Sequence, residues 1–176
     1  MAKRNKILFS AIGFISILAL LSFYFGFIES RRTLSTDRHF SVSYNVLTNT
    51  ITTFDQHSGE TTRLIIGYDP DFLWAPDSKR LAITATNEYG KRWSNVIDLE
   101  KHMGIVMPSK SRILYAVNGI EETDDENNAT VIIDEWLDNT HVLMKFSLID
   151  DTETEVTGWF TFDLITREIE DLQILQ

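Results

Sequence analysis

Short apolar runs separated by polar clusters fill the chain from His39 to its end. The runs are rich in Val, Ile, Thr and aromatic residues, and Gly, Asn, Asp and Ser separate them, which is typical of strands joined by tight turns. We find no stretch of helical periodicity after His39 and therefore expect an all-β domain. The expected strands are SVSYNVL, TITTF, TTRLII, RLAITAT, NVIDL, ILYAV, TVIIDEW, HVLMKFSLI and GWFTFDLI.

A different pattern precedes this region. Residues 7–28 form an uncharged run of 22 residues after Lys3, Arg4 and Lys6. As a helix the run would span about 33 Å, which is enough to cross a hydrocarbon core of about 30 Å. It is longer than the apolar part of a signal peptide and ends without a small-x-small cleavage site, so we predict an uncleaved anchor. The predicted divisions are a tail (1–6), a transmembrane helix (7–28), a linker (29–38) and a β domain (39–176).

The positive residues of the short tail predict that the N-terminus stays in the cytoplasm. The β domain would then be extracytoplasmic, on a protein that crosses the cell membrane once. Ser22 and Gly26 form a small-xxx-small pair. This pair would allow two helices to approach closely, although small residues are also common in membrane helices that do not pair.

The β region repeats itself. Trp74 precedes the turn Ala-Pro-Asp-Ser and an apolar strand, and Trp136 precedes Leu-Asp-Asn-Thr and another. In the first strand we expect Leu81 and Ile83 to face one side and Ala82 and Thr84 the other, because side chains alternate along a strand. Each strand then returns through a polar loop as a run that contains a tryptophan, Trp93 in one copy and Trp159 in the other.

Aspartates mark the ends of three strands. Asp55, Asp98 and Asp163 each follow an apolar residue and precede a polar turn, and a partial third copy surrounds Asp55. The spacings are 43 and 65 residues, of which the first is about the length of one four-stranded propeller blade. The excess in the second spacing falls in residues 117–130.

The stretch WAPDSKRLAIT, from Trp74 to Thr84, resembles the WD40-like repeat of TolB-type β-propellers. That family carries Ser-Pro-Asp-Gly after an aromatic residue, whereas this chain has Ala75 and Ser78 at the first and last of these positions. The run Val-Ile-Asp-Leu that ends at Leu99 resembles the family's strand ending in Asp-Leu. The resemblance implies propeller-like units, which occur in periplasmic interaction proteins and in peptidase propellers.

About three such units fit into the chain, and propellers usually close with four to eight blades. We therefore expect propeller-like or sandwich-like antiparallel repeats. Three arrangements stay open at this point: an open or sandwich-like array, a ring that a homo-oligomer completes, and an edge that a partner covers.

Charge and composition limit the function. The chain has 26 acidic and 16 basic residues, and after residue 28 the formal charge is −13. Such a surface repels phosphate backbones, so we expect no nucleic-acid partner. The chain has no cysteine, which excludes disulfides, thiolate metal sites and a cysteine nucleophile.

Candidate chemistry is sparse. His39, His57, His102 and His141 have no metal-binding spacing, and His57 and His102 fall in predicted turns. We find no G-x-S-x-G motif and no phosphate-binding glycine loop, and we expect neither a cofactor nor enzymatic activity. The candidate binding residues are two tryptophans that could stack on a peptide or sugar, although their repeated positions favour core packing. The other candidates lie in an acidic loop, which could gather around calcium or stay solvated. The complete set of candidate binding residues is Trp93, Trp159, Glu121, Glu122, Asp124, Asp125 and Glu126.

The sequence thus predicts a membrane-anchored extracytoplasmic module that binds an envelope protein or peptide. Two alternatives stay open. One is a sensor domain that binds a small ligand or calcium, and the other is a structural subunit of an oligomeric β assembly.

Overall fold

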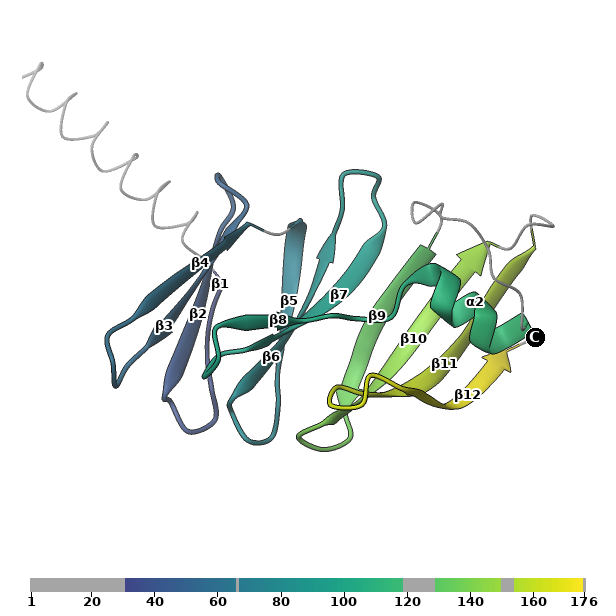
Figure 1. Ribbon diagram of the computed structural model, residues 1–176. Coiled ribbons are helices and arrows are strands. Elements are labelled where there is room, and N and C mark those ends of the chain that lie inside the picture. The colour runs from purple at the N-terminus through teal and green to yellow at the C-terminus, as the bar shows by residue number, and fades with distance from the viewer. Residues whose placement is uncertain (1–30, 66, 119–128, 150–153, 176) are drawn as a thin grey trace, which may run out of the picture.

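The computed structural model describes residues 31–65, 67–118, 129–149 and 154–175, which form three successive four-stranded antiparallel units (Figure 1). The first unit contains β1 (Arg31–Leu34), β2 (Phe40–Asn45), β3 (Thr50–Asp55) and β4 (Thr61–Ile65). The second contains β5 (Tyr68–Trp74), β6 (Arg80–Thr86), β7 (Arg92–Asp98) and β8 (Met103–Ile105). The third contains β9 (Ala129–Trp136), β10 (His141–Ile149), β11 (Glu155–Asp163) and β12 (Ile169–Leu175). The predicted antiparallel repeats are confirmed.

The second and third units share one sheet. Within each unit neighbouring strands are antiparallel, but β7 and β9 are parallel and meet at a single residue pair, Trp93 and Val131. The second and third units thereby form an eight-stranded sheet, while the first unit is a separate four-stranded sheet.

Part of the region that the sequence predicts as a linker, residues 29–38, is a strand. Residues Arg31–Leu34 form β1, which pairs along its whole length with β2. The sequence RRTL is too short and too charged to indicate a strand by itself, and its conformation is fixed by the neighbouring strand. Strand β5 is not among the expected strands. It contains Pro70, which disfavours a strand in the sequence, and a register shift between Tyr68 and Asp71 accommodates this residue.

The prediction of a strand for ILYAV, and with it a purely β domain, is also wrong. These residues lie in helix α2 (Lys110–Asn118). The Ser109 hydroxyl accepts a hydrogen bond from the Arg112 backbone N–H at 3.3 Å, as an N-cap residue does. Ile113 and Leu114 are buried, whereas Tyr115 is exposed. The apolar residues of ILYAV are therefore explained by one buried face of a short helix and not by the alternating faces of a strand.

The second unit is buried on both faces. Toward the first unit it presents Leu81 and Ile83, which pack with Val42, Tyr44 and other residues of that sheet. Toward the third unit it presents Ala82 and its neighbour across the strands, Val96. The predicted division of β6 between two faces is therefore confirmed for Leu81, Ile83 and Ala82.

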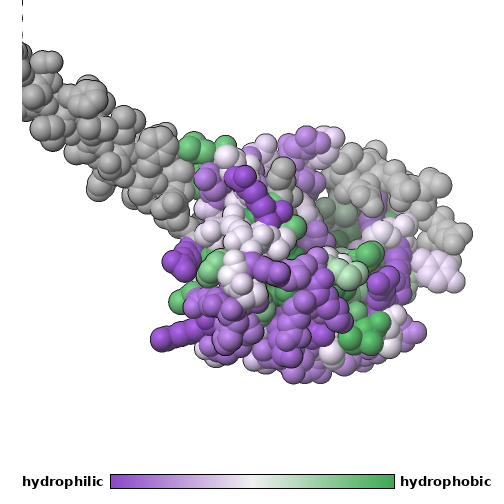
Figure 2. All heavy atoms as spheres, turned by 60° about the vertical axis from the view of Figure 1, so that its left-hand side comes forward, coloured by the Kyte–Doolittle hydropathy of each residue, from purple (hydrophilic) through white to green (hydrophobic). Residues whose placement is uncertain are grey.

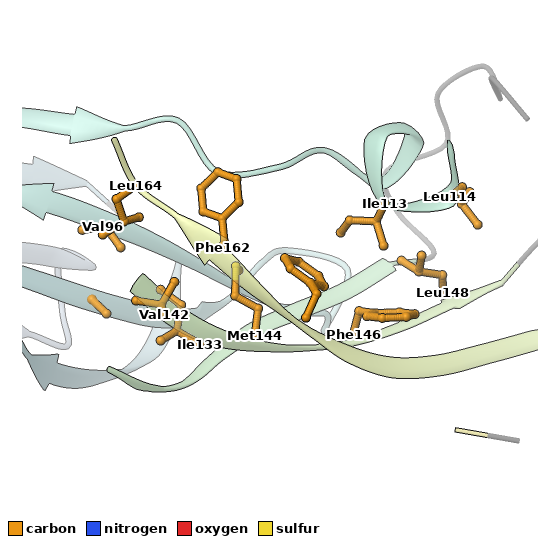
Figure 3. Packing of buried hydrophobic residues seen from close by; sticks show 12 residues of the cluster. Val96, Ile113, Leu114, Ile133, Val142, Met144, Phe146, Leu148, Phe162 and Leu164 are labelled. Carbon is orange, nitrogen blue, oxygen red and sulfur yellow. The ribbon is translucent and has the colours of Figure 1, made fainter. Parts of the chain in front are cut away.

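The larger core lies between the second unit, the third unit and α2 (Figure 3). Phe160 and Phe162 of β11 are fully buried there, next to Met144 of β10 and Ile113 of the helix. Each such side chain stabilises the fold by about 1.5–3 kcal/mol relative to its exposed state. Helix α2 thus closes the core at the face of the third unit.

The outward face of the first unit is mixed. Because Val42 and Tyr44 point into the core, the alternate residues point outward. Ser43 and Thr52 are partly exposed there, whereas Leu34 and Phe54 are exposed beside the buried Ser41. Figure 2 shows this side, where pale and purple spheres predominate over green ones.

Candidate functional site

A cleft of about 900 Å³ lies between the first and second units. Its walls come from β3 and β4, from β6 and β7, from residues 104–110, which run from β8 to the first residue of α2, and from the beginning of β9. The site therefore draws on all three units and on the segment that connects the second to the third. The sequence signal for it is weak, because residues from six separate segments meet there.

Strand β7 and the short strand β8 form part of the cleft. Strand β8 pairs with β7 only along Val96, Ile97 and Asp98. The chain then turns away into residues 106–109 and α2 instead of following β7 further. Ser94 and Asn95 of β7, just beyond the paired part, line the cleft. On this side of β7 the next strand is β9, which pairs with β7 at Trp93 and whose Ile133 N–H donates to the Ser94 hydroxyl at 2.8 Å. The edge of the second unit thus carries β8 at one end and β9 at the other.

The cleft is apolar and nearly neutral. Leu64 of β4 faces Ile83 and Ile97 of the second unit there, and Ile105 and Met107 contribute further along. Val106 stands at the rim with 65% of its surface exposed. The ionisable residues in the lining are His102 and Lys110, although the chain as a whole carries a formal charge of −10.

Polar side chains mark the two ends of the cleft. At one end His102, in the turn before β8, lies 3.3 Å from the Thr62 hydroxyl and 3.3 Å from a carboxylate oxygen of Glu60. These contacts tie the turn of the second unit to β4 of the first. At the other end lie Asn87 and Trp93. The Asn87 side-chain oxygen accepts hydrogen bonds from the backbone of its own hairpin.

The two tryptophans of the predicted binding set lie apart. Trp93 lines the cleft, while Trp159 pairs with Lys145 and Gln173 in the third unit. Lys145 is exposed, and its neighbours Met144 and Phe146 point into the core, so Trp159 lies on the outward face. The prediction that Trp93 and Trp159 occupy matching places is wrong. Counted by pairing across each hairpin, Gly158 is the counterpart of Trp93, one residue before Trp159.

Other predicted features lie outside the described residues. They include the acidic-loop residues Glu121, Glu122, Asp124, Asp125 and Glu126, and the anchor expected at 7–28. Among the residues that the structure does describe, no helix has the length and apolar character needed to cross a membrane. The predicted turn positions of His57 and His102 are confirmed, and His141 begins β10.

The three strand-ending aspartates are confirmed and perform the same local task. Each carboxylate accepts a backbone N–H two or three residues later and so closes the turn that follows the strand. The distances are 2.8 Å from His57 N to Asp55, 3.0 Å from Lys101 N to Asp98 and 2.6 Å from Ile165 N to Asp163. The N–H of His57 is the largest of the causes that lower the pKa of Asp55 to about 2, and the N–H of Ile165 lowers the pKa of Asp163 in the same way.

A basic side chain from the first turn of each unit lies against each of these aspartates. His39 Nε2 is 2.9 Å from Asp55 Oδ1, and His141 Nε2 is 3.8 Å from Asp163 Oδ2. In the second unit Arg80 Nε is 3.8 Å from Asp98 Oδ2. The pairs connect the two turns at one end of each unit and account for the repeated aspartate as a structural feature.

Comparison of the sequence with protein-family models and with curated proteins finds no match. Among solved structures, the chain is similar to the β-propeller domain of the Trilobed protease from Pyrococcus furiosus, with 12% identity, a TM-score of 0.48, and coverage of 85% of this chain and 43% of that one. It is also similar to the acylaminoacyl peptidase of Pyrococcus horikoshii, with 14% identity, a TM-score of 0.47, and coverage of 84% and 25%. A third similar structure is Tne2 in complex with Tni2, with 13% identity, a TM-score of 0.49, and coverage of 82% and 97%.

The chain spans less than half the length of the two peptidase chains. These likenesses concern the arrangement of strands. The strand order and the two cores of this chain define its three blade-like units.

Proposed function

We propose that this protein is a non-catalytic binding module that takes an extended peptide segment of a partner protein into the cleft between its first and second units. The observation that carries the proposal is an apolar, nearly neutral cleft beside β7 and the short strand β8. An extended peptide can lie in such a cleft with alternate side chains in its apolar pockets.

The chemistry of the cleft defines the partner segment. A segment with apolar side chains at alternate positions would fill the space beside Leu64, Ile97 and Ile105. Basic residues on either side of that segment would be attracted by the acidic surface of the chain. We therefore propose a short apolar strand with basic flanks in an envelope protein as the bound partner.

The proposal includes the cellular location. Residues 7–28 would anchor the chain in the membrane and hold the binding module on the extracytoplasmic side. The absence of cysteine from the sequence makes this testable, because Thr48→Cys and Asn5→Cys each introduce a single thiol. A membrane-impermeant maleimide should label intact cells carrying Thr48→Cys and should leave Asn5→Cys unlabelled until the cells are lysed. Equal labelling of both in intact cells contradicts the orientation.

Photo-crosslinking tests the binding itself. A benzophenone amino acid at Ser109, on the cleft lining, should give a discrete crosslinked product in native membranes. The same amino acid at Val46, an exposed residue of the β2–β3 hairpin, serves as the matched control.

A charge substitution tests whether the Ser109 product comes from binding in the cleft or from a chance collision. Val106→Lys places a charge on the exposed rim and should abolish the Ser109 product, whereas Val46→Lys, at a similarly exposed valine, should leave it intact. A product that survives Val106→Lys, or that forms equally from Val46, overturns the proposal.

A further inference from the structure

Two histidines and one aspartate meet at the turn end of the first unit, and none of the three lines the cleft. His39 lies in the turn between β1 and β2, and Asp55 and His57 lie at the turn between β3 and β4. Both turns are at the lower end of the first unit in Figure 1. One ligand atom of each residue lies within 4.8 Å of the others. The centres of the two imidazole rings are 4.1 Å apart.

The cluster is already partly oriented for a ligand. The His39 ring stacks on Phe40 at 4.4 Å with an interplanar angle of 5°, and its Nε2 points to Asp55 Oδ1 at 2.9 Å. The other oxygen of Asp55 accepts a hydrogen bond from the Ser58 hydroxyl at 2.9 Å. Such outer contacts fix the direction of a metal-binding carboxylate. His57 is exposed, so its ring is able to rotate.

The two equivalent turns of the second unit carry an ion pair in place of the two histidines. Backbone bonds identify the equivalent residues: Gln56 N–H donates to the His39 carbonyl and Leu99 N–H to the Lys79 carbonyl, both at 2.9 Å. Lys79 is thus the counterpart of His39. Glu100, two residues after the strand-ending aspartate, is the counterpart of His57.

Lys79 and Glu100 form an ion pair at 2.9 Å, so opposite charges hold the two turns of the second unit together. In the first unit two imidazoles face each other at these places. Neutral imidazoles attract each other only weakly, but together with a carboxylate they make the nitrogen and oxygen ligand set of a transition-metal site. A bound cation would supply the connection that the Lys–Glu pair supplies in the second unit.

We propose that His39, Asp55 and His57 bind a divalent transition metal ion, with Zn²⁺ as the ion best suited to this ligand set. Metal–ligand bonds of about 2.0–2.2 Å in a tetrahedral site place the ligand atoms about 3.3 Å apart. Rotation of the exposed His57 ring brings the three atoms to this spacing. The fourth position of the metal stays open to water or to a partner's side chain. Because imidazole binds a metal ion in its unprotonated form, zinc binding weakens as the pH falls.

Calorimetric titration with zinc chloride tests the site on the full-length chain, held in mild detergent and carrying no histidine tag. We expect saturable binding of one ion per chain and a higher unfolding temperature in its presence. His57→Ala removes an exposed ligand and should weaken zinc binding by about tenfold or more. Because His57 is on the surface, the variant should unfold at the wild-type temperature when zinc is absent.

Two other histidines provide matched controls. His102→Ala changes an exposed turn histidine beside the cleft, and His141→Gln changes the single histidine of the cluster His141, Asp163 and Glu170 in the third unit. Both variants should bind zinc as the wild type does. The proposal is overturned if the wild type shows no saturable binding, if His57→Ala binds normally, or if either control variant loses binding.

Discussion

The indole nitrogen of Trp136 donates a hydrogen bond to the backbone carbonyl of Leu73 at 3.0 Å, across the boundary between the third and second units. Trp74 makes the corresponding contact one unit earlier, where its indole nitrogen donates to the Thr33 hydroxyl at 3.1 Å. Each tryptophan ends the first strand of its unit and reaches the first strand of the unit before it. The recurrence of tryptophan at these two positions therefore has a physical reason, which is the joining of successive units.

Trp136→Phe should lower the free energy of unfolding by about 0.5–1.5 kcal/mol, because it keeps an aromatic ring but removes the donor to Leu73. Urea unfolding followed by circular dichroism measures the change. Trp159→Phe is the matched control on the outward face and should change stability by less than about 0.5 kcal/mol. Equal effects of the two substitutions would show that the indole donor of Trp136 does not stabilise the boundary between units.

Ser94→Ala tests a second connection between units. The buried Ser94 hydroxyl accepts a hydrogen bond from the backbone N–H of Ile133 at 2.8 Å and lies 2.6 Å from the Thr84 hydroxyl. Removing it leaves a buried N–H without its acceptor, which costs about 1–3 kcal/mol. We expect this loss in urea unfolding, together with faster hydrogen exchange at the Ile133 amide.

Ser43→Ala on the outward face of the first unit is the control for this substitution and should leave the Ile133 amide as protected as in the wild type. An unchanged exchange rate in Ser94→Ala would mean that the contact contributes nothing to the joining of the second and third units.

Several local features of the fold were predictable because they depend on short-range chemistry. The three aspartates were found since a carboxylate at the end of a strand can accept backbone N–H groups of the following turn. The strands β6 and β10 match their expected ranges because each is a continuous run of apolar and β-branched residues. In both cases the information lies within a few residues of the element.

The missed features depend on distant partners. The first unit was recognised only in part, because its first turn has no tryptophan and no proline. That turn nevertheless has the same geometry as the turn after Trp74. Asp37 accepts the His39 N–H and Asp77 accepts the Lys79 N–H, both at 2.9 Å, and Arg38 and Ser78 both have φ of 61°. The sequence signal for this turn is Asp37, three residues before β2 begins at Phe40.

The cleft was also beyond prediction from the sequence. Trp93, one of the candidate binding residues, lines the cleft. Trp159 lies on the outward face of the third unit, because the expected match between the two repeats is shifted by one residue. A shift of one residue in a strand exchanges its two faces. Helix α2, by contrast, carried a usable signal in Ser109, which follows Pro108 and caps the helix.

Gly158→Ala should be strongly destabilising, whereas Gly104→Ala should be nearly neutral. A Cβ atom at Gly158 would lie 2.2 Å from the Gln173 carbonyl oxygen and 2.7 Å from the Phe146 ring, so β11 and β12 would have to move apart. At Gly104 a Cβ atom would meet nothing within 4 Å. Overpacking of this kind typically costs about 1–3 kcal/mol.

Thermal and urea unfolding of the two glycine variants in parallel make the comparison direct. Both glycines lie in strands, so the difference between them isolates the close approach at Gly158. Similar stabilities of the two variants would contradict the close packing of β12 on β11.

The contact between His141 and Asp138 should make the stability of the third unit depend on pH. The side chain of Asp138, 2.8 Å from His141 Nδ1, raises the pKa of His141 above its usual value near 6.5. A histidine with a raised folded-state pKa stabilises the fold fully below its unfolded pKa, and this contribution disappears as the pH rises through the folded pKa. Wild type should therefore lose more stability than His141→Asn between about pH 6 and pH 8.

His102→Asn is the control, because His102 is exposed in the turn before β8, and this variant should lose as much stability between the two pH values as the wild type. Urea unfolding at both pH values measures this difference, and an equal loss in the wild type and His141→Asn would exclude a stabilising role for the protonated ring.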